Sequence, residues 1–275
     1  MALKKRQKEA IELMKEGENV FLSGEAGTGK SYVIDQFKEH LDRNGIKYVV
    51  AAPTGLAALN VGGTTLHRMF GLSTEIFSQS VTMYNVEEVE VIIIDEISMC
   101  RKDIFQKIAR EIMKFRNPPL VEDEIEHKRC RDKQIIVVGD FFQLPPVLTK
   151  KDLEAIDHYK EVVPEWFENG DNNLSKDEIY AFQCKEWEQL GFKTVVLNEV
   201  VRQDDKDYID NLNKIRRGNA EGLEFINNNS SKTEVDKAIY LCGTNAEANA
   251  KNTNNLNKIK SEERIYCSEE EGEVE

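Results

Sequence analysis

A glycine-rich run that ends in lysine and serine is the part of this 275-residue chain best suited to chemistry. It reads Gly24-Glu-Ala-Gly-Thr-Gly-Lys-Ser31 and matches a phosphate-binding P-loop at every required position. Glycines at the first, fourth and sixth places let backbone N–H groups turn inward around an anion. Lys30 is then placed to reach the β- and γ-phosphates, and Ser31 to bind the accompanying Mg²⁺. The run predicts that the chain binds a nucleoside triphosphate.

Two adjacent carboxylates follow the most apolar segment of the chain. Asp95 and Glu96 come at the end of Glu90-Val-Ile-Ile-Ile-Asp95, which is apolar on both faces, as a central buried strand should be. One acid can hold Mg²⁺ through its water shell while the other polarises the attacking water. Alone, such a pair is often only a helix cap. Beside a P-loop we interpret Asp95 as a metal residue and Glu96 as a general base.

A glutamine follows the next apolar segment, in Gly139-Asp-Phe-Phe-Gln-Leu-Pro-Pro-Val147. Gln143 could sense the γ-phosphate by hydrogen bonding, and the two prolines would fix the loop that carries it. The alternative is a proline-terminated strand whose aromatic pair, Phe141 and Phe142, packs into the core.

Small hydroxyl side chains, an imidazole and a cation gather between the first strand and the central one. The segments Ala52–Asn60 and Val61–Phe70 contain the types that grip phosphates and stack on unpaired bases, namely Thr54, Thr64, Thr65, His67 and Arg68. Gly62-Gly63 could equally mark a plain turn, and His67 a structural histidine.

Arg202 lies in Leu197-Asn-Glu-Val-Val-Arg-Gln203, at the junction of two expected domains. A cation there could reach across a cleft to the γ-phosphate and assist catalysis. A surface salt bridge is the equally open alternative.

These residues need a scaffold, and β-rich runs alternating with helical patterns supply one. Such alternation predicts a mostly parallel sheet with helices on both faces. The expected strands are Val20–Ser23, Tyr48–Ala52, Val89–Asp95, Ile135–Gly139 and Thr194–Leu197, with a helix over Tyr32–Leu41 after the P-loop. We expect a first domain over residues 1–197 and the start of a second α/β domain over 198–261. The second should contain a helix from Asp207, a strand Ala238–Cys242 and a helix near Asn249–Asn257, before an acidic tail at 262–275.

The composition, 40% hydrophobic and 32% charged, is typical of a soluble globular protein. No apolar stretch is long enough to span a bilayer, so we expect a cytoplasmic or nucleoid protein, or a nuclear or mitochondrial one in a eukaryote. Residues 152–171 and 262–275 each carry a net charge of −6, which leaves the rest near −1 of the total −13. A positive groove for nucleic acid therefore remains possible. Five scattered cysteines favour reduced thiols, and His127 with Cys130 is too small a set for zinc.

Taken in order, the motifs resemble the PIF-type (petite integration frequency) superfamily-1B DNA helicases from about Leu3 to Asn257. The series comprises the P-loop, Pro-Thr-Gly-Leu-Ala-Ala, Gly-Gly-Thr-Thr-Leu-His, Asp-Glu-Ile-Ser-Met, Gly-Asp-Phe-Phe-Gln-Leu-Pro-Pro-Val and Val-Arg-Gln. The resemblance implies a RecA-like P-loop fold, MgATP hydrolysis and 5′ to 3′ movement on single-stranded DNA. We also expect forked or structured DNA as a partner and a monomeric protein. It also implies roles in DNA repair, recombination and telomere maintenance, and a small wedge insertion near residues 73–85, with Phe77 and Tyr84.

The resemblance assigns residues as follows. Gln7 would read adenine. Nucleotide binding would involve Gly24, Gly27, Thr28, Gly29, Lys30 and Ser31, metal binding Ser31 and Asp95, and catalysis Lys30, Glu96, Gln143 and Arg202. The strand of DNA would contact Thr54, Gly55, Thr65, His67 and Phe70.

Family members continue into the rest of the second RecA-like domain, with a further arginine-bearing motif, so we expect this chain to be a shortened form. Two other functions stay open. One is a nucleotide-gated single-strand DNA-binding module with little catalysis, and the other is a RecD-like motor.

Overall fold

The computed structural model describes residues 3–73, 89–116, 133–162, 174–175, 177–201, 205–230, 238–261 and 264. By backbone contacts the chain divides into two compact units, Met1–Asn228 and Asn229–Glu275. The domain boundary near residue 198 stays a prediction. Residues 74–85 of the wedge segment, the acidic tail apart from residue 264, Arg202, and the pair His127 and Cys130 lie outside the described residues.

A six-stranded sheet organises the first unit, and every strand pairing in it is parallel. The strand order is β3-β2-β4-β5-β1-β6. The strands are β1 (Val20–Gly24), β2 (Tyr48–Ala52), β3 (Thr64–Thr65), β4 (Val91–Ile94), β5 (Gln134–Gly139) and β6 (Lys193–Leu197). The five strands predicted for the first domain are all confirmed, and the two-residue β3 of this sheet was not anticipated.

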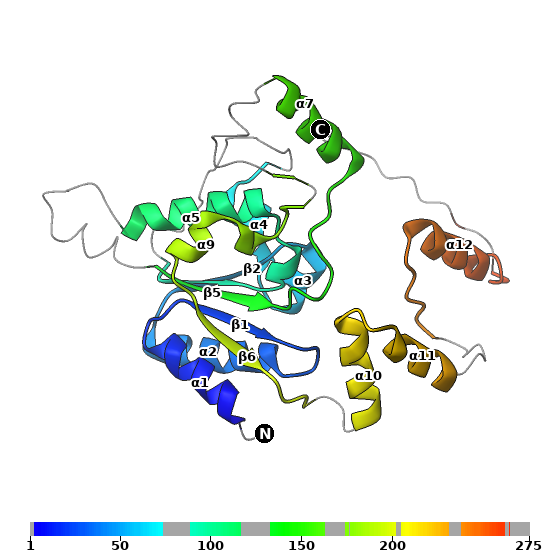
Figure 1. The fold of residues 1–275 in the computed structure, drawn as a ribbon, viewed down its shortest axis with the longest axis horizontal. Helices are drawn as coiled ribbons and strands as arrows, with labels where there is room; N and C mark the ends of the chain where they lie inside the picture. Colours follow the sequence, from blue (N-terminus) through cyan, green and yellow to red (C-terminus); the bar gives the residue numbers. More distant parts are fainter. Residues whose placement is uncertain are drawn as a thin grey trace, which may run out of the picture. The chain divides into compact units, whose positions relative to one another are not determined.

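Helices cover both faces of this sheet, as parallel strands buried on two sides require (Figure 1). The helices of the first unit are α1 (Lys5–Lys15), α2 (Lys30–Asn44), α3 (Gly55–Asn60), α4 (Leu66–Phe70), α5 (Lys102–Arg116), α7 (Lys150–Val162), α9 (Lys185–Gln189), α10 (Lys206–Arg216) and α11 (Ala220–Asn229, which ends at the unit boundary). Short 3₁₀ turns occupy η1 (Ile97–Met99) and η2 (Ala181–Gln183). The expected mostly parallel α/β fold is confirmed.

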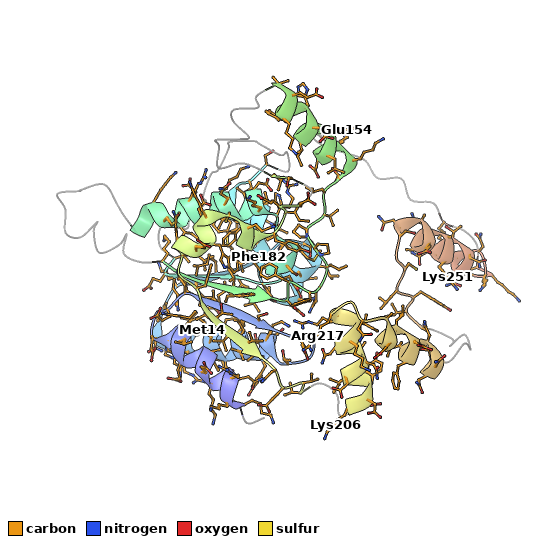
Figure 2. The ribbon with its side chains drawn as sticks, in the orientation of Figure 1. Met14, Glu154, Phe182, Lys206, Arg217 and Lys251 are labelled. Atoms are coloured by element: carbon orange, nitrogen blue, oxygen red, sulfur yellow. The ribbon has the colours of Figure 1, made fainter. Side chains whose placement is uncertain are left out.

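The alternation of side chains along β4 shows why this strand is apolar throughout. Ile92 and Ile94 belong to a core cluster with α4, α5 and α9, whereas Val91 and Ile93 belong to a second cluster with α1 and α2. All four are buried, and a strand with a core on each side needs apolar residues at every position. Figure 2 shows the two layers through Phe182 on one side of the sheet and Met14 on the other.

The helix predicted from Asp207 is confirmed as α10. Asp205 caps it, because its side chain accepts a hydrogen bond from the Tyr208 N–H at 3.0 Å. Gly218 follows the helix with a φ of 77°, a left-handed conformation that suits glycine.

The second unit differs from expectation at Ala238–Cys242, which is not a strand. Ile239 and Leu241 are 92% and 98% exposed, and no described strand pairs with this segment. A strand exists only where a neighbour supplies hydrogen bonds and an apolar face, so β-propensity alone was insufficient here. The expected polar helix is confirmed as α12 (Asn245–Leu256), none of whose residues is buried.

Candidate nucleotide-binding site

The glycine-rich run forms a tight loop between β1 and α2, and glycine is needed at both ends of it. A side chain at Gly24 would come within 2.7 Å of the Leu197 carbonyl oxygen on the neighbouring β6. Gly29 has a φ of 84°, and a Cβ there would lie 2.7 Å from Gln7 Nε2. Gly27 also has positive φ, at 79°. The glycines therefore let the loop pack closely against β6 and α1 and expose backbone to a ligand at the start of α2.

Lys30 folds back onto this loop. Its Nζ donates hydrogen bonds to the carbonyl oxygens of Gly24 at 2.7 Å and Glu25 at 3.1 Å. Burial lowers the pKa of Lys30, while the negative charges of Asp140, Glu96 and Asp95 act in the opposite direction. The ammonium group thus sits among carboxylates at the mouth of the loop, in position to transfer its hydrogen bonds to phosphate oxygens.

Gln7 supports the same loop from α1. It is 4% exposed, its Nε2 donates to the Thr28 carbonyl at 3.0 Å, and its Oε1 accepts from the Lys4 N–H at 2.9 Å. The Thr28 hydroxyl in turn donates to the Glu25 carbonyl at 2.8 Å. Gln7 therefore stabilises the P-loop through a hydrogen bond, a role that its position in the sequence did not indicate. Adenine reading by Gln7 stays a prediction.

Asp95 and Glu96 lie beyond the end of β4, two strands away from the P-loop strand. Glu96 adopts a left-handed backbone with φ 51°, and it is the single non-glycine residue with positive φ in the described part of the chain. Its N–H donates to Asp95 Oδ1 at 2.9 Å. Burial raises the pKa of both carboxyls, and the charge of Asp95 raises that of Glu96 further. Backbone strain and raised pKa values at one place are typical of functional sites.

Gln143 is held by the loop that follows β5, the strand between β4 and β1. Its N–H donates to the Asp140 carbonyl at 2.8 Å, and its Nε2 lies 3.4 Å from Asp140 Oδ2. The core interpretation holds for Phe141, which packs against Phe21 and other rings, and fails for Phe142, which is 63% exposed.

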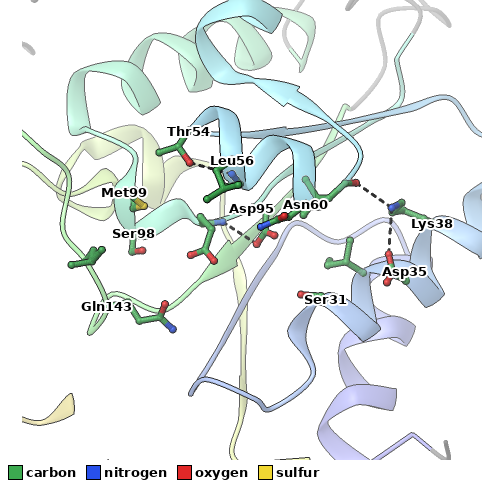
Figure 3. Close-up of a pocket in the computed structure, with 15 residues that line it drawn as sticks. Ser31, Asp35, Lys38, Thr54, Leu56, Asn60, Asp95, Ser98, Met99 and Gln143 are labelled. Carbon is green, nitrogen blue, oxygen red and sulfur yellow. Dashed lines mark hydrogen bonds and ion pairs between the residues drawn. The ribbon is translucent and has the colours of Figure 1, made fainter. Parts of the chain in front are cut away.

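Four of the residues described above line one cavity of about 540 Å³, shown in Figure 3, whereas Gln7, Lys30 and the P-loop glycines are not among its lining residues. Ser31, Asp95, Glu96 and Gln143 line it, together with the first residues of α3. Ser98 lines it too, and sequence reasoning missed it. Ser98 is 1% exposed, and its hydroxyl hydrogen-bonds to no other described residue. Only its place in Asp-Glu-Ile-Ser-Met could have indicated it.

The residues predicted to contact DNA lie on α3, β3 and α4, beside β2. Thr54 and Thr65 each cap a helix by accepting a backbone N–H, from Ala57 at 3.2 Å and Arg68 at 3.3 Å. Gly55 is exposed at the start of α3.

His67 is half-buried, and burial lowers its pKa, with the nearby charge of Arg101 acting in the same direction. The prediction that Phe70 contacts DNA is wrong. Its side chain is fully buried in the core, so it packs under the sheet and presents no ring to a base.

Two observations concern arginines near the site. Arg202 is not described, but its neighbour Val201 donates its N–H to the Gly27 carbonyl at 2.8 Å, which brings this segment to the P-loop. Arg216, at the end of α10, donates hydrogen bonds from its Nε and Nη2 to the Asp140 carboxylate. No motif in the sequence indicated Arg216.

Comparison with known proteins decides the family. The profile of the PIF1-like helicases matches residues 2–163, more than half of the chain. The chain belongs to the PIF1-like helicase family. It is 29% identical over 266 residues to the ATP-dependent DNA helicase Pif1 of Campylobacter jejuni, covering 89% of this chain and 52% of that protein. It is 30% identical over 299 residues to PIF1 of Saccharomyces cerevisiae, covering all of this chain and 30% of the yeast protein.

Solved Pif1 structures agree with this membership. Bacteroides Pif1 bound to single-stranded DNA matches with a TM-score of 0.69 and 28% identity, over 93% of this chain and 57% of that one. Bacteroides Pif1 with ADP-AlF4 matches with a TM-score of 0.68 and 28% identity over the same shares. The chain thus spans about half the length, or less, of the PIF1-like helicases that it resembles.

Further metal sites and membrane segments are not found in the described residues. No group of three or more histidine, cysteine, aspartate or glutamate side chains there is arranged to hold a metal ion. Cys100, Cys184 and Cys242 are free thiols. None of the helices that the structure describes has both the length and the apolar character needed to cross a bilayer.

Proposed function

We propose that this chain contains the ATP-hydrolysing core of a DNA helicase that couples hydrolysis to 5′ to 3′ movement on single-stranded DNA. The supporting observation is that Ser31, Asp95, Glu96 and Gln143 line one cavity beside Lys30, at the carboxyl edge of a parallel sheet. Ligands bind at this edge in open α/β folds. Membership of the PIF1-like family supports DNA as the partner.

In this proposal each residue has a defined task. The P-loop backbone and Lys30 bind the β- and γ-phosphates, and Gln143 donates to the γ-phosphate. Glu96 orients and deprotonates the attacking water, for which its raised pKa suits it. Arg202 is proposed to stabilise charge on the transferred phosphoryl group, since Val201 lies at the P-loop.

The residues present fit a magnesium ion. The Ser31 hydroxyl and the Asp95 carboxylate line the same cavity, and oxygen ligands of this kind are those that Mg²⁺ prefers. When bound, the ion would neutralise charge between the β- and γ-phosphates.

We further propose that Thr54, Gly55, Thr65 and His67 contact single-stranded or forked DNA, and that the protein acts as a monomer in the nucleoid, cytoplasm or nucleus. Closure of the ATP-binding cleft would shift these residues along the strand. Phe70 is excluded from this set because of its burial.

A steady-state ATPase assay of the whole chain with Mg²⁺, with and without an oligo(dT) strand, tests the proposal. Turnover should rise with DNA and be lost in Lys30→Ala. Labelled forks with a 5′ or a 3′ tail then test direction. Nucleotide-dependent DNA binding without turnover would instead favour the binding module, and absence of ATP binding would refute the proposal.

A further inference from the structure

Arg216 forms an ion pair with two hydrogen bonds near the nucleotide site. It is the last residue of α10, and its Nε and Nη2 donate to Asp140 Oδ2 and Oδ1 at 2.8 and 2.7 Å. Both hydrogen bonds are charge-assisted and parallel, which is the geometry in which arginine binds a carboxylate best. The two residues are 76 positions apart in the sequence.

The surroundings hold the guanidinium in this place. Its centre lies 4.3 Å from the centroid of the exposed Phe142 ring, and Nη1 lies 3.9 Å from Glu25 Oε1 in the P-loop. The Asp140 side chain is 1% exposed. A carboxylate buried to this degree is costly unless it is paired, so Arg216 is what permits Asp140 to stay ionised there.

Asp140 in turn organises the loop that carries Gln143. One carboxylate oxygen accepts the Phe142 N–H at 3.2 Å, the other lies 3.4 Å from Gln143 Nε2, and the Asp140 carbonyl accepts the Gln143 N–H. A continuous chain of contacts therefore runs from α10 through Asp140 to a side chain on the wall of the ATP cavity.

We propose that Arg216 is a positioning residue for ATP hydrolysis, which acts through Asp140 to set Gln143 and so makes turnover depend on the placement of α10. This inference rests on the proposed function. The simpler alternative is that the ion pair only docks α10 and leaves Gln143 unaffected.

Arg216→Gln tests the proposal against Arg217→Gln, a matched control. Arg217 is adjacent in the sequence, its side chain is 68% exposed, and among the described residues its ion pair is with Glu25, at 3.9 Å. In Arg216→Gln we expect kcat to fall by about 10²-fold, the scale of a misplaced catalytic group. KM for ATP should change by less than about threefold, because the phosphates bind mainly to the P-loop. Arg216→Lys, which keeps the charge and loses the fork, should recover part of the rate.

A double variant shows whether Arg216 acts through Asp140. If it does, Arg216→Gln in an Asp140→Asn background should cost little more than Asp140→Asn alone. If the fold-losses in kcat of the two single variants multiply in the double variant, the proposal is overturned. It is also overturned if Arg217→Gln lowers kcat as much as Arg216→Gln does, or if Arg216→Gln changes only KM.

Hydrogen exchange gives a readout that does not require turnover. The amides of Phe142 and Gln143 should exchange faster in Arg216→Gln than in the wild type and Arg217→Gln, at equal helix content by circular dichroism. Unchanged exchange there would overturn the proposal. An inactive wild type with this exchange difference would refute the proposed function and leave the link from Arg216 to the loop standing.

Discussion

At the scale of single residues, Glu96 combines three properties that rarely meet outside functional sites. Its backbone is left-handed, its side chain lines the cavity, and burial raises its pKa. A strained, partly desolvated carboxylate lowers the stability of the folded protein. Destabilising features of this kind are found mainly at sites where they serve a function.

Glu96→Gln should separate nucleotide binding from hydrolysis. The amide keeps the shape of the side chain and cannot accept a proton from water. We expect turnover to fall by about 10² to 10⁴-fold, with affinity for a fluorescent ATP analogue nearly unchanged. Single-turnover kinetics with equilibrium titration would measure both. A parallel loss of affinity would contradict the assignment of Glu96 as a base.

The same substitution should change how stability depends on pH. Because the pKa of Glu96 is raised in the folded state, the folded protein binds more protons than the unfolded chain above the ordinary carboxylate range. The contribution of Glu96 to stability is therefore greatest at low pH and falls as pH rises through its raised pKa.

Glu96→Gln removes this dependence, so without nucleotide the variant should be more stable than the wild type near neutral pH and lose that advantage toward pH 4. Urea denaturation across this range would measure it. If the stability advantage of Glu96→Gln over the wild type grew as the pH was lowered, the pKa of Glu96 would be lowered in the folded state and the prediction would be wrong.

At this scale the sequence could locate residues that belong to a compact motif, while the roles of these residues stay predictions. Asp95 and Gln143 line one cavity, and Lys30 lies near Asp95, because each motif follows a parallel strand and such strands end at one edge. Arg216 could not be found this way, since its partner is 76 positions distant and one ion pair leaves no pattern in a sequence. The burial of Phe70 likewise depends on which face of α4 meets the sheet.

At the scale of elements, Gly63 fixes the distance between β3 and β2. A Cβ at Gly63 would lie 2.2 Å from the Val50 carbonyl oxygen, which is backbone and has little freedom to move. The pair Gly62-Gly63 is therefore more than a plain turn. Only the first glycine has positive φ, and the second is needed for the close approach of the strand.

Gly63→Ala should displace β3 and with it the capping residue Thr65. We expect a loss of about 1 to 3 kcal/mol in the free energy of unfolding, the usual cost of an overpacked site. Affinity for single-stranded DNA should fall while ATP affinity is kept, because the P-loop is on the far side of β4 and β5. Thermal denaturation and fluorescence anisotropy would measure these changes.

Gly243→Ala is a suitable control for Gly63→Ala. A Cβ at Gly243 would meet only Glu247 Oε2, at 3.7 Å, so stability and DNA affinity should be unchanged. Equal effects in the two variants would contradict the role given to Gly63.

The central strands β4 and β5 were predictable because they are buried on both faces and therefore almost continuously apolar. The segment Ala238–Cys242 has a similar composition and is not a strand, because no described strand lies beside it. The amino-acid composition of a segment indicates whether it can form a strand. Whether it does so depends on a neighbouring strand with which it can pair.

At the scale of the whole molecule, the two units differ in how much they bury. The first contains both large core clusters, whereas α12 in the second buries none of its residues. Stability in such a chain is unevenly distributed, and ligand binding should stabilise only the unit that forms the site.

MgATP at 100 times its dissociation constant should stabilise the first unit by about 2.7 kcal/mol. Hydrogen exchange should slow in β1, α2 and β5 and stay fast in α12 with or without nucleotide. Mass spectrometry of exchanged peptides would measure both, with Lys30→Ala as the control that shows no response. Slowing in α12 would contradict the independence of the two units.

The hydrogen bond from Val201 to Gly27 limits how far α10 can travel. Only four residue steps separate Val201 from Asp205, the cap of α10, so a fully extended linker reaches at most about 14 Å. A larger swing of this helix must first pull the Val201 amide away from the phosphate loop. The number of residues between Val201 and Asp205 therefore limits how far α10 could move while the hydrogen bond from Val201 to Gly27 is kept.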